Sequence, residues 1–462
     1  MSPTQPTTPS PTQELAEFAA ALTYADIPDP VREHAELCLL DTVGCALFST
    51  RLPWCEIVTG LVDGRSAHAR AVVWGTRVLA DAGDAALANA TAAHGFELDE
   101  VHPAGVHPGP VAWSVALALG EELGSSGADI LTAGVAGYEV GTRIGLSVQR
   151  AHLKAGFHAM GTIGSFIAAA TAAKILGLDR EQTRHAIGIV GSFASGLIAA
   201  QEGAMTKRLH AGRAAQNGVE AALLAGRGFT GIPDVLENPT GGFCRTTGGG
   251  QEELELLTAG VGEVWETANT GFKIHPSCAA THSALDVTQQ LRAEHGFAAE
   301  DVTRMTVHAS SHAVLHSGWR YQPTGITAAQ MNYFFVLALM LRHGEVPIEA
   351  FSDEGIRDPA TLALTDRIEV YADEAVDALG RPGRYGVRVR IQLSDGRALE
   401  GAASQRRGNR ALPVPAGEVQ AKFRRLAETV LEPARVTAVQ DAALGLHGLE
   451  DAAALTRLLA TT

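Results

Sequence analysis

The sequence predicts a mostly α protein: a large all-helical domain with a smaller α+β domain inserted near its C-terminal end. Three observations support this prediction. Glycine and alanine are abundant, and over much of the first 270 residues apolar positions recur three or four apart. Between residues 302 and 393 apolar and polar residues alternate, as in half-buried strands. After residue 404 the helical pattern returns. We therefore expect a tail over 1–13, a helical domain over 14–270 plus 405–462, and an α+β domain over 271–404.

The first domain is expected to be a succession of packed helices. Helical spacing of apolar residues predicts helices over residues 14–22, 30–48, 82–95, 111–123, 130–148, 162–176, 180–189, 194–200 and 214–224. The segment 162–176 is apolar nearly all round, so this helix must be buried. A short strand is expected over 71–74. Three prolines prevent a continuous helix over 103–110, which predicts a loop there.

The second domain is expected to combine strands and helices. The sequence predicts strands over 302–308, 367–371 and 387–393, a hairpin turn over 394–397, and helices over 279–294 and 327–342. Beyond this domain, helices are expected over 418–431 and 441–459, the last of which should dock back on the first domain.

The bulk composition describes a globular protein that binds small anions rather than polyanions. A net charge of −15 argues against nucleic acid or an anionic membrane as a partner, because either needs a basic face. No apolar run reaches the ~18 residues of a membrane span. Five cysteines without CxxC spacing predict reduced thiols, a cytoplasmic location and no zinc site. Residues 1–13 have no basic start or apolar core, so they predict a disordered tail and no signal peptide.

The run 201–213 concentrates charge and glycine in an otherwise apolar half of the chain. Lys207 and Arg208 stand beside the predicted start of a helix, where unpaired N–H groups attract carboxylate or phosphate. Gly203 and Gly212 would let the backbone approach such a ligand closely. The alternative is a solvated basic turn that caps the helix. The glycines at 248–250 lack the strand and the Lys-Ser/Thr of a phosphate loop, so a surface turn is expected there.

Several histidines and carboxyl groups stand at positions suited to proton transfer. The segment 97–102 is Glu-Leu-Asp-Glu-Val-His, and His107 follows in a His-Pro-Gly sequence. His158 precedes the buried helix, so a neutral imidazole with a lowered pKa is expected; a core histidine bonded to a backbone carbonyl is the alternative. Asp99, His102 and His107 could also form a metal site with mixed nitrogen and oxygen ligands.

In their order and separations, these motifs resemble the MmgE/PrpD family, whose members include 2-methylcitrate dehydratases, cis-aconitate decarboxylases and iminodisuccinate epimerases. The resemblance covers nearly the whole chain. The matching pieces are Leu40–Gly44, Gly137–Val140, Glu97–Gly109, Gly156–Gly164, Gln201–Gly212, Gly228–Gly231 and Lys273–His282. It implies a helical domain made from both ends of the chain, an inserted α+β lid, a homodimer, and catalysis without a cofactor or metal.

The resemblance also implies a role for particular residues. The implied catalytic residues are His158, Lys207, Asp99 and His107, and the implied substrate-binding residues are Glu97, His102, Lys273, Tyr321 and Arg208. Lys207 would hold a carboxylate or stabilise an enolate, and Lys273 would supply a second ammonium from the lid. Glu97 and Glu100 replace usual aspartates and Val101 a common threonine, which argues against 2-methylcitrate or cis-aconitate itself as substrate.

The family's reactions share a carbanion next to a carboxylate, which needs a base, a cation and an acid. We therefore expect a cofactor-independent hydro-lyase of the dehydratase type, acting on a small di- or tricarboxylic acid. An epimerase (an isomerase) or a decarboxylase of the same family is an alternative. A protein that only binds such acids is another.

Overall fold

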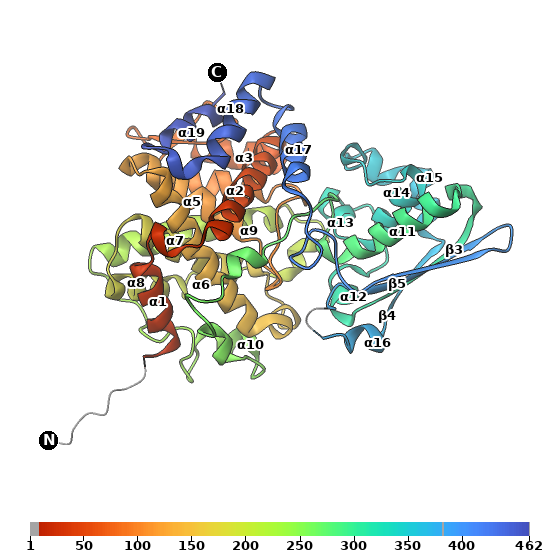
Figure 1. Ribbon diagram of the computed structural model, residues 1–462, viewed down its shortest axis with the longest axis horizontal. Coiled ribbons are helices and arrows are strands. Elements are labelled where there is room, and N and C mark those ends of the chain that lie inside the picture. The colour runs from red at the N-terminus through yellow and green to blue at the C-terminus, as the bar shows by residue number, and fades with distance from the viewer. Residues whose placement is uncertain (1–8, 381–382, 462) are drawn as a thin grey trace. The chain divides into compact units, whose positions relative to one another are not determined.

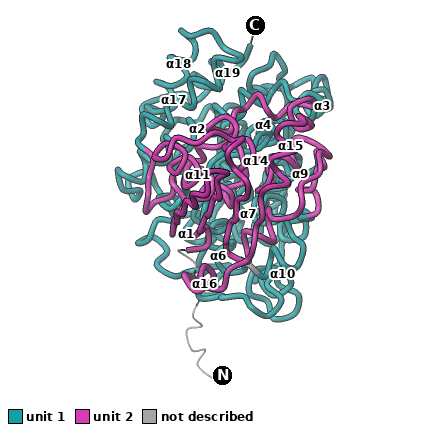
Figure 2. The backbone as a smooth tube through the Cα atoms, turned by 90° about the vertical axis from the view of Figure 1, so that its right-hand side faces the viewer, with its two compact units in different colours: residues 1–198, 206–270, 415–462 teal, residues 199–205, 271–414 magenta. Residues whose placement is uncertain are grey.

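The computed structural model describes residues 9–380 and 383–461 of the chain, and they fall into two compact units (Figure 2). The first unit contains Met1–Ile198, Thr206–Thr270 and Pro415–Thr462, and the second contains Ala199–Met205 and Gly271–Val414. Two segments that we expected in the helical domain, 199–205 and 405–414, therefore group with the second unit. Residues 1–8 of the predicted tail lie outside the described residues.

The first unit is helical apart from one short strand pair, β1 (Ala71–Val72) with β2 (Leu79–Ala80) (Figure 1). Its helices are α1 (Pro11–Ala21), α2 (Asp29–Ser49), α3 (Pro53–Val62), α4 (Ala82–Ala93), α5 (Pro108–Leu123), α6 (Gly127–Lys154), α7 (Ala159–Ile175), α8 (Arg180–Val190), α9 (Thr206–Gly226), α10 (Phe243–Gly248), α17 (Ala416–Ala427), α18 (Pro433–Leu444) and α19 (Ala453–Leu459).

Helix α7 lies at the centre of this unit, as its apolar composition predicts. It packs against α5, α6, α8 and α9, and Met160 to Ala173 are buried throughout. Small residues permit this close packing. A Cβ at Gly218 of α9 would lie 2.4 Å from the backbone carbon of Ala168 on α7, so only glycine fits where these two helices meet.

The two ends of the chain meet in the first unit. Helices α17 and α18 both contact α2, which lies near them in Figure 1, and α19 contacts α5. The expected docking of the last helix on the first domain is therefore confirmed. The two helices expected after residue 417 are in fact three, because the expected helix 441–459 is interrupted at Gly445, where α18 ends and the 3-10 turn η9 (Leu446–Gly448) follows.

Other helices of the chain also differ from expectation. Helix α1 begins at Pro11, where the Ser10 side chain caps it, so residues 11–13 of the expected tail are helical. Helix α5 begins at Pro108 rather than after Pro110, because proline is tolerated in a first turn that has no intrahelical N–H partner. Residues 194–197 form no helix, and only a 3-10 turn, η2 (Ile198–Glu202), follows.

The second unit has a four-stranded sheet of order β4-β3-β5-β6, built from β3 (Val302–Ala309), β4 (Ile368–Ala372), β5 (Val387–Leu393) and β6 (Ala398–Ala403). Strands β3 and β4 are parallel and the other pairs antiparallel, with Val307 opposite both Val370 and Val389. Its helices are α11 (His282–His295), α12 (Ser311–Ser317), α13 (Ile326–Gln330), α14 (Tyr333–His343), α15 (Pro359–Thr365) and α16 (Glu374–Asp377).

The strand predictions for this unit are confirmed, and one helix prediction is wrong. The alternation on β5 buries Val387, Val389, Ile391 and Leu393, and α11 covers that strand. The helix expected over 327–342 is divided into α13 and α14, because the Asn332 side chain accepts hydrogen bonds from two N–H groups and starts a new helix.

In the described part of the chain, no helix combines the length and the apolar composition that a membrane crossing requires. All five cysteines lie in the described part of the chain, where they are buried and form no disulfide.

Candidate active site

Three buried carboxyl groups of the segment 97–100, between α4 and α5, each contact a different part of the first unit. Glu97 reaches α9, Asp99 reaches two histidines, and Glu100 reaches α6 and the start of α5. Glu97 is 2% exposed, and Asp99 and Glu100 are fully buried. This short segment therefore sets the relative positions of the cations and imidazoles around it.

Glu97 pairs with both cations at the start of α9. Its Oε2 lies 2.8 Å from Lys207 Nζ and 2.6 Å from Arg208 Nη1. Arg208 also donates to the backbone oxygen of His94 at 3.2 Å. Lys207 is 2% exposed and Arg208 fully buried, so the solvated basic turn considered as an alternative is wrong. The two cations lie in the first turn of a helix, and positive charge at a helix N-terminus favours an anionic ligand.

The helix that carries these cations begins earlier than expected. Helix α9 starts at Thr206, eight residues before the predicted start, so Lys207 and Arg208 lie in its first turn. Gly212 lies inside the helix, where an added Cβ would be 2.1 Å from Thr91 Oγ1 and 2.4 Å from the Leu87 oxygen of α4. The expectation that Gly212 lets a ligand approach is therefore wrong: it lets α4 approach.

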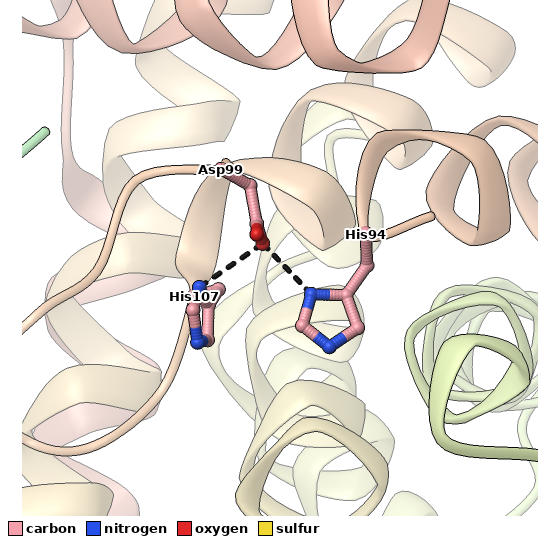
Figure 3. A group of neighbouring side chains, drawn as sticks. All are labelled: His94, Asp99 and His107. Atoms are coloured by element: carbon pink, nitrogen blue, oxygen red, sulfur yellow. Dashed lines mark hydrogen bonds and ion pairs between the residues drawn. The ribbon is translucent and has the colours of Figure 1, made fainter. Parts of the chain in front are cut away.

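Asp99 connects two imidazoles (Figure 3). Its Oδ2 lies 2.7 Å from His94 Nδ1 and 3.0 Å from His107 Nδ1, and the two rings meet edge to face at 5.0 Å. In Figure 3 the Nε2 atoms of both rings point away from Asp99, toward the same side. A carboxylate that holds the Nδ1 proton leaves Nε2 of that ring as a base.

His94 is the member of this group that the sequence analysis missed. It caps the C-terminal end of α4, five residues before Asp99, and is fully buried. We had considered His102 as the third member of a group with Asp99 and His107, but His94 occupies that position. The only signal was its position at the end of a predicted helix, just before the acidic segment.

The three donor atoms of His94, Asp99 and His107 lie within 4.8 Å of one another, close enough to be considered as metal ligands. Ligands of a tetrahedral ion at 2.0–2.2 Å lie roughly 3.3 Å apart from each other. The two contacts to Asp99 are shorter, at 2.7 and 3.0 Å, as expected where a carboxylate lies directly against imidazole nitrogens. The spacing therefore matches a carboxylate that holds two imidazoles better than a preformed metal site.

His158 forms a pair with His210. Their Nδ1 atoms lie 2.8 Å apart, and the rings are 5.0 Å apart by their centroids. Burial and the charge of Lys207 lower the pKa of both groups, that of His210 to about 4. Burial also lowers the pKa of His94 to about 3, against the effect of Asp99. His158 is therefore a neutral imidazole, as expected, but its Nδ1 partner is another histidine rather than a backbone carbonyl.

The hydrogen bonds of His102 serve a structural role. Its Nε2 donates to Glu266 at 3.1 Å, and its Nδ1 accepts the Ala104 N–H at 3.0 Å. Burial opposes ionisation of Glu266, but the hydrogen bonds from His102 and Asn269 lower its pKa to about 2. Both ring nitrogens of His102 are therefore engaged: Nε2 contacts the 266–269 turn, and Nδ1 accepts from the backbone at residue 104. The structure does not bring this ring into the His94–Asp99–His107 group.

The remaining predicted residues, Lys273 and Tyr321, belong to the second unit. Lys273 is fully buried, and with His275 and Arg406 it reinforces the effect of burial in lowering the pKa of His282. Tyr321 donates from its hydroxyl to the Ile356 oxygen at 3.0 Å, and its ring stacks on Phe335. The substrate-binding roles of these two residues stay predictions.

A buried network supports the acidic segment. Glu100 Oε1 accepts from the Tyr138 hydroxyl at 2.5 Å and from the Gly109 N–H at 2.8 Å, which fixes the start of α5 next to His107. Burial raises the pKa of Glu100 to about 8. The Glu100 N–H donates to Asp41, which pairs with Lys422 of α17 at 2.7 Å. The C-terminal part of the chain thus stabilises the segment, a contact between residues far apart in the chain that no local pattern predicts.

Comparisons with known proteins match most of the chain. The model of the MmgE/PrpD N-terminal domain matches residues 13–255, and that of the MmgE/PrpD C-terminal domain matches residues 275–446. A cis-aconitate decarboxylase-like protein of Aspergillus oryzae is 30% identical over 97% of each chain. Cis-aconitate decarboxylase of Aspergillus terreus is 30% identical over 97% of this chain and 95% of its own. The 2-methylcitrate dehydratase of Escherichia coli is 25% identical over 80% of each.

Proposed function

This chain belongs to the MmgE/PrpD family, and we propose that it is a lyase that decarboxylates a small di- or tricarboxylic acid. The relatives that match it over nearly their whole length are named as decarboxylases. The dehydratase matches less of the chain at lower identity. This changes the order of the two reactions in the sequence analysis, where dehydration came first.

The observation that carries the proposal is the buried grouping of Lys207 and Arg208 with neutral imidazoles in one region of the first unit. Lys207 is close enough to act electrostatically on His94, His158 and His210. A cation that is shielded from water holds a carboxylate strongly, and it stabilises negative charge that develops on the adjacent carbon. A neutral imidazole N–H can then protonate that carbon.

In the proposed reaction the bond between carbon and one carboxylate breaks, and its electron pair stays on the carbon as carbon dioxide leaves. Lys207 stabilises the resulting enolate-like charge through a carboxylate that the substrate retains. His158 then supplies a proton to the carbon. The bond to carbon dioxide is thus replaced by a bond to hydrogen, and one proton is consumed per turnover.

A second candidate, dehydration, is favoured by the Asp99 pairs. His94, whose Nδ1 hydrogen-bonds Asp99 Oδ2 at 2.7 Å, presents Nε2 as a base. Removal of a proton next to a carboxylate is the first step of dehydration and also of epimerisation. Decarboxylation needs an acid but no such base, so activity on a hydroxy acid would favour this second candidate.

The reaction class can be measured directly with purified protein in deuterated water. Cis-aconitate, citrate and 2-methylcitrate are suitable test compounds, with carbon dioxide release followed by a coupled assay and products by NMR. We expect carbon dioxide and one carbon-bound deuterium in equal amounts. Loss of water without carbon dioxide would establish a dehydratase, and deuterium exchange without loss of mass an epimerase. Thermal stabilisation without any turnover would indicate a binding protein.

We further propose that the reaction requires neither a metal nor an organic cofactor. The measurement is the rate after exhaustive dialysis against a chelator, followed by addition of divalent ions. An unchanged rate supports the proposal. Loss of activity that added metal restores would contradict it and would favour His94, Asp99 and His107 as the ligands.

A further inference from the structure

His158 and His210 are joined through the same kind of atom, Nδ1, at 2.8 Å. Two neutral imidazoles can form this bond only if one carries its proton on Nδ1 and the other carries it on Nε2. One ring therefore has Nδ1–H and a basic Nε2, and the other has a basic Nδ1 and Nε2–H. The pair always presents one acidic and one basic Nε2, one at each end.

The two ends of this pair are anchored on different elements. His158 is the N-cap residue of α7, and its N–H donates to the Gly196 oxygen at 2.9 Å. His210 lies one turn into α9, after Lys207. His158 retains 9% exposure and His210 8%, whereas His94 beside them has none. Neither Nε2 atom takes part in the bond that joins the rings.

A decarboxylase consumes one proton at carbon in each turnover, and a single neutral histidine that gives up its Nε2 proton would become an anion. We propose that His210 relays a proton from solvent to His158, so that His158 can protonate the substrate carbon without forming an imidazolate. The inference rests on the proposed function, and it adds His210 as a relay residue that does not touch the substrate.

The relay conserves protons at every step. His158 gives its Nε2 proton to the carbanion left by carbon dioxide, and its Nδ1 takes the Nδ1 proton of His210. His210 regains a proton at Nε2 from water. Both rings stay neutral, and the tautomers are exchanged. The reverse transfer restores them after the product has left and water again reaches His158.

The surrounding charges favour this neutral relay over a protonated pair. Lys207, His94 and His107 face His158, and each acts against a positive charge on it. Lys207 acts in the same way on His210. A protonated His158 or His210 is therefore disfavoured between turnovers. The proton must instead reach His158 during each turnover.

The test combines nitrogen NMR with variants. In ¹⁵N-labelled wild-type protein, the relay predicts one ring of the pair with Nδ1–H and the other with an unprotonated Nδ1. In the variant His210→Ala we expect kcat to fall roughly 100-fold, the usual contribution of a proton-transfer group, with KM unchanged. Added imidazole should restore a large part of that loss. Circular dichroism establishes that each variant is folded.

The matched control is His152, another buried histidine with a pKa lowered to about 4 by burial, whose Nε2 contacts Thr162 Oγ1 at 2.8 Å. Added imidazole should not raise the kcat of the variant His152→Ala. The relay is overturned if both rings of the pair carry protons only on Nε2, or if folded His210→Ala keeps the wild-type kcat. The nitrogen spectra report tautomers without turnover. A protein that shows the predicted tautomers but decarboxylates nothing would refute the function alone.

Discussion

Glu97 is the residue on which the charge balance of the proposed site depends. It is the carboxylate partner of two buried cations, with contacts of 2.8 and 2.6 Å to Lys207 and Arg208. Charges removed from water are costly unless they are paired, so this carboxylate stabilises the cations in the absence of a ligand. A polycarboxylate substrate that approaches Lys207 would share the cation with Glu97.

Replacing this carboxylate should destabilise the fold. For Glu97→Gln we expect the free energy of unfolding to fall by about 3 kcal/mol, because two buried cations lose their counter-charge. Urea unfolding measures the change. The matched control is Glu369→Gln, which removes the partner of Arg304 on the exposed face of the sheet. There the free energy of unfolding should hardly change, because water screens an exposed ion pair. Equal effects at the two sites would contradict the assignment of Glu97 as a buried counter-ion.

At the residue scale, the sequence could predict which side chains are of interest but not their partners. Lys207, Asp99, His107 and His158 were chosen by their motifs, and in the structure all lie in the first unit among buried polar groups. The contact of His94 with Asp99 depends on how the chain turns after α4, and the periodicity of apolar residues does not predict that turn. The engagement of His102 with Glu266 joins residues 164 positions apart and was equally hidden.

At the scale of elements, Lys207 is positioned by the start of α9, and α9 is positioned by its packing on α4. Gly212 permits this close packing, since a Cβ there would lie 2.1 Å from Thr91 Oγ1. The charge and glycine of this run predict a turn before the helix, whereas the run itself is helical from Thr206. Glycine normally weakens a helix, and here the tertiary contact with α4 outweighs that preference.

Filling this contact should destabilise the protein even though alanine is the better helix former. For Gly212→Ala we expect a loss of roughly 1–3 kcal/mol, as for other overpacked core sites. Gly83 on α4 is the matched control, because a Cβ there has no neighbour closer than 3.7 Å. Gly83→Ala should be neutral or slightly stabilising. Thermal unfolding of the two variants measures both changes. A Gly212→Ala variant as stable as wild type would contradict the close packing of α9 on α4.

The buried network around Glu100 should make the free energy of unfolding depend on pH. The pKa of Glu100 is raised to about 8 from a usual value of 4.5, so the folded protein keeps a proton that the unfolded chain loses. Between these pH values, this group lowers the free energy of unfolding as pH rises, by at most about 1.4 kcal/mol per unit. Below pH 4.5 its contribution no longer changes.

The variant Glu100→Gln should remove this slope while it keeps a neutral acceptor for Tyr138 and Gly109. We therefore expect the variant to gain stability over wild type as pH rises from 5 to 8, as measured by urea unfolding at each pH. A constant difference between the two proteins across that range would show that Glu100 is ionised in the folded state.

At the scale of the whole molecule, the sequence predicted the architecture better than the boundaries. The buried helix α7, the alternation on β5 and the return of helices at the C-terminal end all followed from hydrophobic period alone. Segments 199–205 and 405–414 group with the second unit, because tertiary contacts rather than local pattern decide such membership. The homodimer and the cytoplasmic location stay predictions.

The net charge of −15 gives the whole molecule a field that repels the anionic substrate we propose. Binding must then depend on local cations that are shielded from solvent. Lys207 and Arg208 meet this condition, since they are 2% and 0% exposed. Added salt screens the long-range repulsion more than the short-range attraction, so it should not abolish binding.

The central claim is that the buried groups of the first unit, with His158 as the acid, carry out the chemistry. The most direct measurement is the rate of carbon dioxide release by His158→Gln, compared with wild type and with His152→Gln, from the di- or tricarboxylic acid that wild type decarboxylates fastest. We predict a loss of roughly 100-fold or more for His158→Gln, with its circular dichroism unchanged, and a rate near that of wild type for His152→Gln. A folded His158→Gln that releases carbon dioxide at the wild-type rate would contradict the claim.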